Sequence, residues 1–323
     1  MLQSELVRLR LPPPLIGFGL AMIGPTLLEF GTEAQKLEHI PKIVQGEIRW
    51  CQGYSEPGAG SDLASLKTSA VLDGDRFIIN GQKVWTSYAE KADWIFCLVR
   101  TNTHAKQAGI TFILIDMETP GITTRPIGLI SGASPFCEVF FSDVVAYPKD
   151  VIGEVDRGWT VAKALLGHER SMVGEVFAQS VSGGEMELVG LAREHVGVGA
   201  DGRVTDLLLR DHIIRVAMDE RAFMLTVKRI KDGMVAAKRE GKRAMPGHES
   251  SILKLFGTEL NQRRRQLAVE ILGADGLGWS GDGYAPGHLA MTREWLRSRG
   301  NTIEGGTSEI QLDIIAKHTL GLP

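Results

Sequence analysis

The stretch of this chain best suited to chemistry is Trp50–Asp62, which begins like a strand and then bends at a Glu-Pro-Gly-Ala-Gly-Ser-Asp run. Pro57 fixes its own φ, and Gly58 and Gly60 permit positive φ and a close approach of a ligand to the backbone. Turns of this kind gather backbone N–H groups in a small space, which suits a phosphate or an electron-rich ring. The simpler alternative is a Pro/Gly turn that only joins two strands.

A second candidate is Glu169, an acid on the apolar face of a helix that we expect over about 159–178. It follows Leu165 and Leu166 at helical spacing, so its carboxylate is predicted to point into that face. Burial raises the pKa of a carboxyl, and such an acid can serve as the general base that removes a weakly acidic C–H proton. The alternative is a buried ion pair with a distant Arg or Lys.

Three blocks of the sequence resemble motifs of the acyl-CoA dehydrogenase family. They are Trp50–Asp62, which is similar to the flavin loop of that family, Gly81–Ser87 and Gly305–Gln311. The blocks occur in the family's order and at about its separations, and the likeness runs from about Pro25 to the last residue. The resemblance implies an FAD-dependent enzyme that converts an acyl-CoA thioester to a trans-2-enoyl-CoA.

The resemblance also bears on the catalytic base. In this family a glutamate removes the α-proton of the thioester while the β-hydride passes to flavin N5. Most members carry the base just before the Gly-Thr of the C-terminal motif, where this chain has Gly305. The isovaleryl- and long-chain-specific enzymes carry it in a Glu-Arg pair on the helix after the barrel, which Glu169 and Arg170 resemble. The resemblance therefore implies Glu169 as the base, with Glu304 as the reserve candidate, and Arg170 as a substrate-binding residue.

The family's FAD contacts carry over onto matching positions of this chain. These positions are Gln52, Tyr54, Ser55, Gly60, Ser61, Trp85, Thr86, Ser87, Thr307 and Glu309. The resemblance implies that Ser55 donates to the isoalloxazine ring, that Trp85 packs over it and that Ser87 donates toward its N5 atom. Gly60 and Ser61 would approach the diphosphate and the thioester, which makes Ser61 a substrate contact as well. From the residue alone, a core aromatic position for Trp85 is as well supported as a flavin contact.

The last helix is expected to start near Ser308 and to end at Gly321. Ser308 and Gln311 have capping-box spacing. Thr307 and Glu309 lie at the same end, where free N–H groups and the helix dipole could face the flavin diphosphate. The alternative is ordinary helix capping, and the acidic Glu309 partly opposes an anion.

Three features depart from the family. Tyr88 stands where members commonly have a small residue or Asn. The Arg-x-x-Phe-Gly segment, which reaches the flavin of the neighbouring subunit, is not visible between Arg193 and Asp211, and Arg210 and Arg215 are candidate substitutes. We also expect a shortened N-terminal helical domain.

An α+β fold must position these residues. We expect a partial N-terminal helical segment over 1–48, a small flavin-binding β-barrel or sandwich over 49–150, and a C-terminal helical bundle over 151–323 that carries the base and the oligomer contacts. Between Trp50 and Tyr147 the apolar period is two, with a hairpin at Asp73-Gly74. The runs at 94–99 and 110–115 are nearly all apolar, which predicts strands buried on both faces.

The remaining elements are predicted to be helices. Thr32 and Gln35 have capping-box spacing and start one helix before the strands. After the strands, helices are expected over about 159–178, 205–239, 249–272, 290–297 and 308–321.

Bulk properties exclude several classes of protein. The 323 residues carry a formal charge of −3, so no global field recruits nucleic acid, and no apolar run reaches the length of a membrane span. No secretory signal is evident, and Cys51, Cys97 and Cys137 are interpreted as reduced core residues of a cytoplasmic protein.

The resemblance implies a homodimer or homotetramer, with a heteromer as an alternative, and an electron-transfer flavoprotein as acceptor. Two further functions stay open. One is a catalytically impaired or non-catalytic partner subunit that pairs with a full-length chain. The other is an acyl-CoA oxidase that passes electrons to oxygen.

Overall fold

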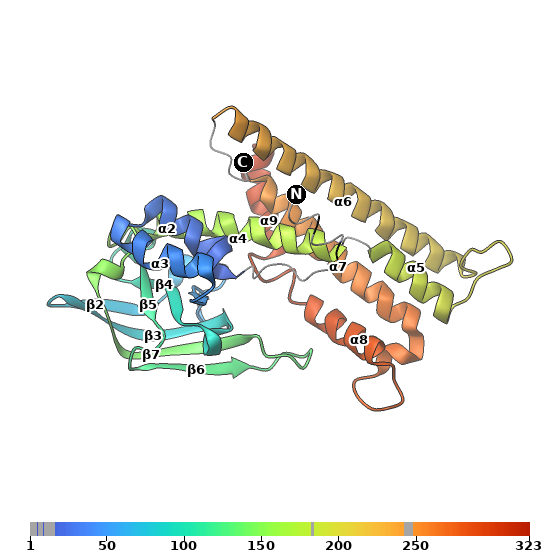
Figure 1. Cartoon of the computed structure of the whole chain (residues 1–323), viewed down its shortest axis with the longest axis horizontal. Helices are drawn as coiled ribbons and strands as arrows, with labels where there is room; N and C mark the ends of the chain where they lie inside the picture. Colours follow the sequence, from blue (N-terminus) through green and yellow to red (C-terminus); the bar gives the residue numbers. More distant parts are fainter. Residues whose placement is uncertain (1–4, 6–8, 10–16, 182–183, 242–247) are drawn as a thin grey trace. The chain divides into compact units, whose positions relative to one another are not determined.

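The computed structural model of the chain describes residues 5, 9, 17–181, 184–241 and 248–323. They form two compact units, one of Met1–Gly128 with Ser134–Glu169 and the other of Leu129–Ala133 with Arg170–Pro323. Helices, then one curled sheet, then helices follow along the chain, which confirms the predicted α+β class (Figure 1). Within the described ranges, no helix is both long enough and apolar enough to cross a membrane.

The first unit begins with short helices, η1 (Gly19–Ile23), α2 (Gly24–Phe30) and α3 (Glu33–Gln45). The predicted capping box starts α3, because Thr32 Oγ1 accepts from Gln35 N at 3.2 Å and Gln35 Oε1 accepts from Thr32 N at 2.9 Å. The buried Gln35 amide also donates to the carbonyls of Lys149 and Val151. The same side chain therefore caps α3 and ties it to the segment after the sheet.

Seven strands form a single sheet in the order β1-β4-β2-β3-β7-β6, with β5 pairing β4. They are β1 (Trp50–Gly53), β2 (Ser69–Asp73), β3 (Arg76–Ser87), β4 (Trp94–Arg100), β5 (Ile110–Asp116), β6 (Ile122–Ile127) and β7 (Phe136–Ala146). The hairpin is confirmed, since Asp73 pairs with Arg76 and Gly74 takes a φ of 65° in the turn.

The centre of this sheet is the core of the first unit. The inner residues of β4 and β5 are buried on both faces, as predicted from their apolar runs. Cys51, Cys97 and Cys137 are buried and unbridged among them, which agrees with their interpretation as core residues. β1 lies at one end of the strand order and pairs in parallel with β4, and the turn follows directly after it.

Helices make up most of the second unit. α4 (Gly158–Val181) leads from the first unit into it, followed by α5 (Gly184–His195), α6 (Leu207–Arg239), α7 (Glu249–Leu272), η6 (Gly273–Leu277), α8 (Pro286–Ser298), α9 (Ser308–Ile314) and η7 (Ile315–Thr319). The sequence reading missed α5, although Leu188, Leu191 and Ala192 bury one face at helical spacing. Two glycines in that short segment weaken its helix signal. α8 begins at Pro286, four residues before the predicted start, because a proline fits the first turn of a helix.

Gly158 starts α4 directly against the backbone of β5. A Cβ at this position would lie 2.3 Å from Phe112 N and 2.6 Å from the carbonyl carbon of Thr111. Backbone atoms cannot rotate away, so we expect Gly158→Ala to lower the free energy of unfolding by about 1–3 kcal/mol. Gly190→Ala in α5 is the control, since a Cβ there meets nothing within 4 Å and should be neutral or mildly stabilising. Urea denaturation compares the two, and equal effects would contradict the packing argument.

Candidate active site

The turn after β1 is closed by its own backbone. Glu56 N donates to Ala59 O and Ala59 N donates to Glu56 O, both at 3.0 Å. The suggestion that Gly58 and Gly60 supply positive φ is wrong, because neither residue is in that conformation. A Cβ on either glycine would meet no described atom within 4 Å, so the space beside the turn is open. The glycines therefore leave room for a close neighbour and do not relieve backbone strain.

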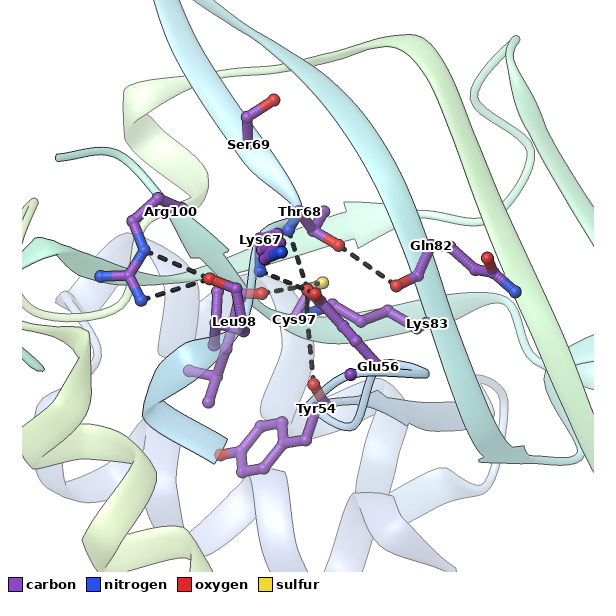
Figure 2. A network of polar contacts seen from close by, with 12 residues as sticks. Tyr54, Glu56, Lys67, Thr68, Ser69, Gln82, Lys83, Cys97, Leu98 and Arg100 are labelled. Atoms are coloured by element: carbon purple, nitrogen blue, oxygen red, sulfur yellow. Dashed lines mark hydrogen bonds and ion pairs between the residues drawn. The ribbon is translucent and has the colours of Figure 1, made fainter. Parts of the chain in front are cut away.

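A buried ion pair fixes the turn to the sheet. The Lys83 side chain is fully buried on β3, and its Nζ lies 2.8 Å from Glu56 Oε1 and donates to Tyr54 O at 3.2 Å. Glu56 also accepts from the backbone N–H groups of Lys67 and Thr68 at 2.7 and 2.9 Å. Figure 2 shows these groups converging on one carboxylate. The backbone before the turn, at Tyr54, and after it, at Lys67 and Thr68, is thus held by the Lys83–Glu56 ion pair.

This network sets the ionisation of Glu56. Burial by itself raises the pKa of the carboxyl, but the charge of Lys83 and the hydrogen bonds from Lys83, Lys67 and Thr68 outweigh that effect. The pKa of Glu56 is therefore held below its usual value. Sequence reasoning missed the pair. The sequence does contain a signal for it. Lys83 falls at even spacing after Phe77 and Ile79 on β3, so strand alternation directs its side chain to the same buried face.

A bulge in β3 decides where Trp85 points. Lys83 pairs with Val139 and Thr86 with Cys137, so β3 holds one extra residue between these pairs. Trp85 takes a φ of 62° at that point. The strand alternation shifts there, which buries Thr86 and leaves Trp85 55% exposed, with an edge contact to Phe136 at 6.1 Å. The interpretation of Trp85 as a core aromatic residue is therefore wrong.

The other sequence-predicted residues of the turn and of β3 differ in exposure. Ser55 and Ser87 are half-buried, and Gly60 and Ser61 are exposed. The Tyr54 ring is buried with edge contacts to Phe96 and Phe112. Tyr88, beyond Ser87, takes the left-handed conformation with a φ of 52° and is exposed.

Glu169 lies on α4, where Ala162 and Leu165 are fully buried. Its side chain is half-buried, and its Oε2 accepts a hydrogen bond from Gln52 Nε2 at 3.1 Å. The pKa of Tyr54 is raised well above its usual value, first by burial and then by the negative charge of Glu169. Gln52, Tyr54 and Glu169, 117 residues apart at the extremes, are thus brought together within the first unit. The Arg170 side chain lies outside the described residues.

The C-terminal motif belongs to the second unit. Thr307 is the N-cap of α9, because its hydroxyl accepts from Ile310 N at 3.3 Å. The predicted capping box of Ser308 and Gln311 is therefore wrong. The buried Gln311 amide instead donates to Gly305 O at 3.1 Å and so fixes the loop before the helix. Gly305 takes a φ of 63° and turns the chain tightly just before the helix. Thr307, and not Ser308, therefore stands at the N-cap.

Two acids near this motif have different surroundings. Glu309 is exposed in the first turn of α9, and hydrogen bonds from its own backbone N–H and from Thr307 lower the pKa of its carboxyl. Glu304, the reserve base, accepts from Arg297 Nη2 at 2.7 Å and from Asn301 Nδ2 at 2.6 Å. Glu304 is thus an ion-paired acid that closes the turn after α8.

The first unit also offers groups that suit an aromatic, phosphorylated cofactor. Thr86 Oγ1 is buried and has no hydrogen-bond partner among the described residues. It lies next in sequence to the exposed indole of Trp85, and the glycine turn after β1 has open space beside it. An exposed aromatic face and a glycine turn are features that a flavin ring and its diphosphate can use.

Comparison with known proteins decides the family. The profile of the acyl-CoA dehydrogenase middle domain matches residues 51–144, and that of the C-terminal domain matches residues 156–320. The chain belongs to the acyl-CoA dehydrogenase family. It is therefore an FAD-dependent oxidoreductase, as the motifs implied.

Individual relatives of this acyl-CoA dehydrogenase agree. The acyl-CoA dehydrogenase IpdE1 of Mycobacterium tuberculosis is 38% identical over 99% of this chain and 79% of its own length. A solved structure described as a variant of the Tcur3481-Tcur3483 steroid ACAD superposes with a TM-score of 0.84 at 31% identity, over 100% of this chain and 81% of that one. The ChsE4-ChsE5 complex from Mycobacterium tuberculosis gives a TM-score of 0.78 at 28% identity, with the same two coverages.

Proposed function

We propose that this dehydrogenase converts an acyl-CoA thioester to a trans-2-enoyl-CoA with Glu169 as the base that takes the α-proton. The observation that carries the proposal is the half-buried Glu169 carboxylate, which accepts from the Gln52 amide at 3.1 Å. Gln52 is on β1, within the Trp50–Asp62 block that resembles the flavin loop. A carboxylate at this place lies beside the segment where the family binds FAD.

The surroundings of Glu169 suit proton abstraction. The Gln52 amide orients Oε2 by a directed hydrogen bond, and Glu169 lies near enough to the buried Tyr54 for its negative charge to help raise the pKa of that phenol. The carboxylate oriented in this way can take a proton from a substrate carbon. Arg170, the next residue, is proposed to position the thioester. FAD, when bound, supplies the acceptor for the hydride that leaves the β-carbon.

The proposed FAD contacts differ in what each can offer. Trp85 presents an exposed ring, and the hydroxyls of Ser55, Ser61 and Ser87 are at least partly accessible. Gly60 leaves space for the diphosphate or the thioester. The side chains of Tyr54 and Thr86 are buried, so we propose that these two residues act mainly through their backbone. Thr307 and Glu309 are proposed to approach the diphosphate through the backbone N–H groups at the start of α9.

The test is anaerobic mixing of the purified, FAD-loaded protein with a panel of CoA thioesters. The panel should include straight, branched and steroid-derived acyl groups, because the similar Tcur3481-Tcur3483 structure is described as a steroid ACAD. We expect at least one thioester to bleach the visible flavin absorbance and to yield a trans-2-enoyl-CoA. A flavin-loaded protein that no thioester bleaches would contradict the proposal.

A second candidate function is that of a partner subunit in a heteromeric dehydrogenase. Two of the most similar structures are described with paired names, Tcur3481-Tcur3483 and the ChsE4-ChsE5 complex. This function predicts a colourless protein when the chain is purified alone, and flavin uptake only with a partner chain. A yellow homodimer or homotetramer that reacts with a thioester favours the enzyme.

The electron acceptor and the location complete the proposal. We propose an electron-transfer flavoprotein as acceptor and the cytoplasm as the site of action. An acyl-CoA oxidase would release peroxide during turnover in air at the rate of substrate consumption, and this measurement separates it from a dehydrogenase.

A further inference from the structure

A cluster in the second unit has no part in the proposed reaction. It consists of His195, Asp275 and His288, and one ligand atom from each lies within 4.8 Å of the other two. We propose that this cluster binds one divalent transition-metal ion of the Zn²⁺ class, and we name it the His-Asp-His cluster.

The distances in the cluster suit a shared ion better than hydrogen bonds. The Nδ1 atoms of His195 and His288 lie 3.8 and 3.7 Å from the same oxygen, Asp275 Oδ2. Both distances exceed the usual range of an N–H···O bond, about 2.7–3.2 Å. Zinc bonds of about 2.0–2.2 Å in a tetrahedron place neighbouring ligand atoms about 3.3–3.5 Å apart. The two distances to Asp275 Oδ2 need to shorten by only a few tenths of an ångström, and the imidazole nitrogens, which lie within 4.8 Å of each other, must approach further for all three groups to hold one ion.

The chemistry of the three groups also fits. Imidazole nitrogen and carboxylate oxygen are the ligands that zinc accepts, and three protein ligands leave the fourth position for water. His195 Nε2 is buried and has no hydrogen-bond partner among the described residues, so its ring is not held by an ordinary hydrogen bond at that atom. The imidazole rings lie 4.9 Å apart, edge to face.

The cluster is built from rigid elements and open on one side. His195 ends α5, Asp275 lies in η6, and His288 is in the first turn of α8. Thr292 Oγ1 donates to Gly276 O at 3.0 Å, which holds α8 against η6. The histidine side chains are 14% and 16% exposed, whereas that of Asp275 is 49% exposed, so an ion can enter past the carboxylate. A bound ion would join α5 to η6 and α8 and so stabilise the second unit.

The alternative occupant is a proton, with one imidazolium paired to Asp275. A protonated cluster of this kind holds no metal, and Zn²⁺ would then neither bind the protein nor change its stability. A second alternative is adventitious binding at His248 and His318, whose rings stack 4.5 Å apart elsewhere in the same unit.

The test is calorimetric titration of the metal-free, full-length protein with ZnCl₂, with Co²⁺ absorption as a second readout. We expect one ion per chain, visible bands typical of a tetrahedral Co²⁺ site, and a higher unfolding temperature with Zn²⁺. Asp275→Asn and His288→Ala should each weaken affinity at least about tenfold. His318→Ala and His104→Ala, at exposed histidines, should leave it unchanged.

Each outcome decides the proposal. No binding by the wild-type chain, equal binding by Asp275→Asn, or loss of binding only in His318→Ala would overturn it. Asp275→Asn keeps the shape of a half-exposed side chain, so a folded variant is expected, and its unfolding temperature without metal verifies this. None of these readouts depends on catalysis, so the result is separate from the fate of the proposed reaction.

Discussion

Glu169→Gln is expected to slow the reduction of flavin by acyl-CoA by about 10²–10⁴-fold, the usual contribution of a general base. The amide has the shape of the carboxylate and keeps an oxygen that can accept from Gln52 Nε2, which now donates to Glu169 at 3.1 Å. It cannot take a proton from carbon. FAD content and the unfolding temperature should therefore stay close to wild type while stopped-flow bleaching is lost.

Two matched substitutions make this result specific. Glu154→Gln changes an exposed acid of the same unit and should leave bleaching unchanged. Glu304→Gln tests the reserve base, whose carboxylate is already bound by Arg297 and Asn301. If Glu304→Gln abolishes bleaching and Glu169→Gln does not, the assignment of Glu169 is wrong.

Lys83→Met should lower the free energy of unfolding by about 3–5 kcal/mol, the usual cost of leaving one charge of a buried pair alone. Lys83 is fully buried, and its departure leaves Glu56 without the cation 2.8 Å away. The turn after β1 also loses the hydrogen bond from Lys83 Nζ to Tyr54 O. We therefore expect weaker FAD binding in addition to a lower midpoint in urea.

The matched control is Lys106→Met, which removes an exposed partner from Asp62 at the end of the same turn. That pair is also short, 2.9 Å, but both side chains are more than half exposed, so its loss should cost less than about 1 kcal/mol. The double variant Lys83→Met/Glu56→Leu should regain part of the stability, because neither charge is then stranded. Equal losses for Lys83→Met and Lys106→Met would contradict the role of burial.

The pH dependence follows from the direction of the Glu56 shift. The pKa of Glu56 in the folded protein lies below the usual 4.5, so the pair stabilises the fold above about that pH. This contribution is lost as the pH falls through the folded pKa. In Lys83→Met the buried Glu56 carboxylate has no cation beside it. Protonation of Glu56 removes the free-energy cost of burying that charge. The stability difference between wild type and variant should therefore shrink toward acid pH, and a constant difference from pH 7 to pH 4 would contradict this account.

Local sequence signals determined much of this protein. The sequence predicts the capping box of Thr32 and Gln35, the hairpin at Gly74 and the bounds of α7 at Glu249–Leu272, and the structure has all three. The three motif blocks also indicated the family. Capping, turn chemistry and apolar periodicity act over a few residues, and that is why a single sequence displays them.

Tertiary structure alone decided how distant side chains meet. Nothing in the periodicity of β3 placed a bulge that turns Trp85 outward, since that bulge depends on the register with β7. The pairing of Lys83 with Glu56, 27 residues away, and the meeting of His195 with Asp275 and His288 likewise depend on how strands and helices pack. Proximity between residues far apart in the chain comes from packing and backbone pairing, which local patterns do not encode.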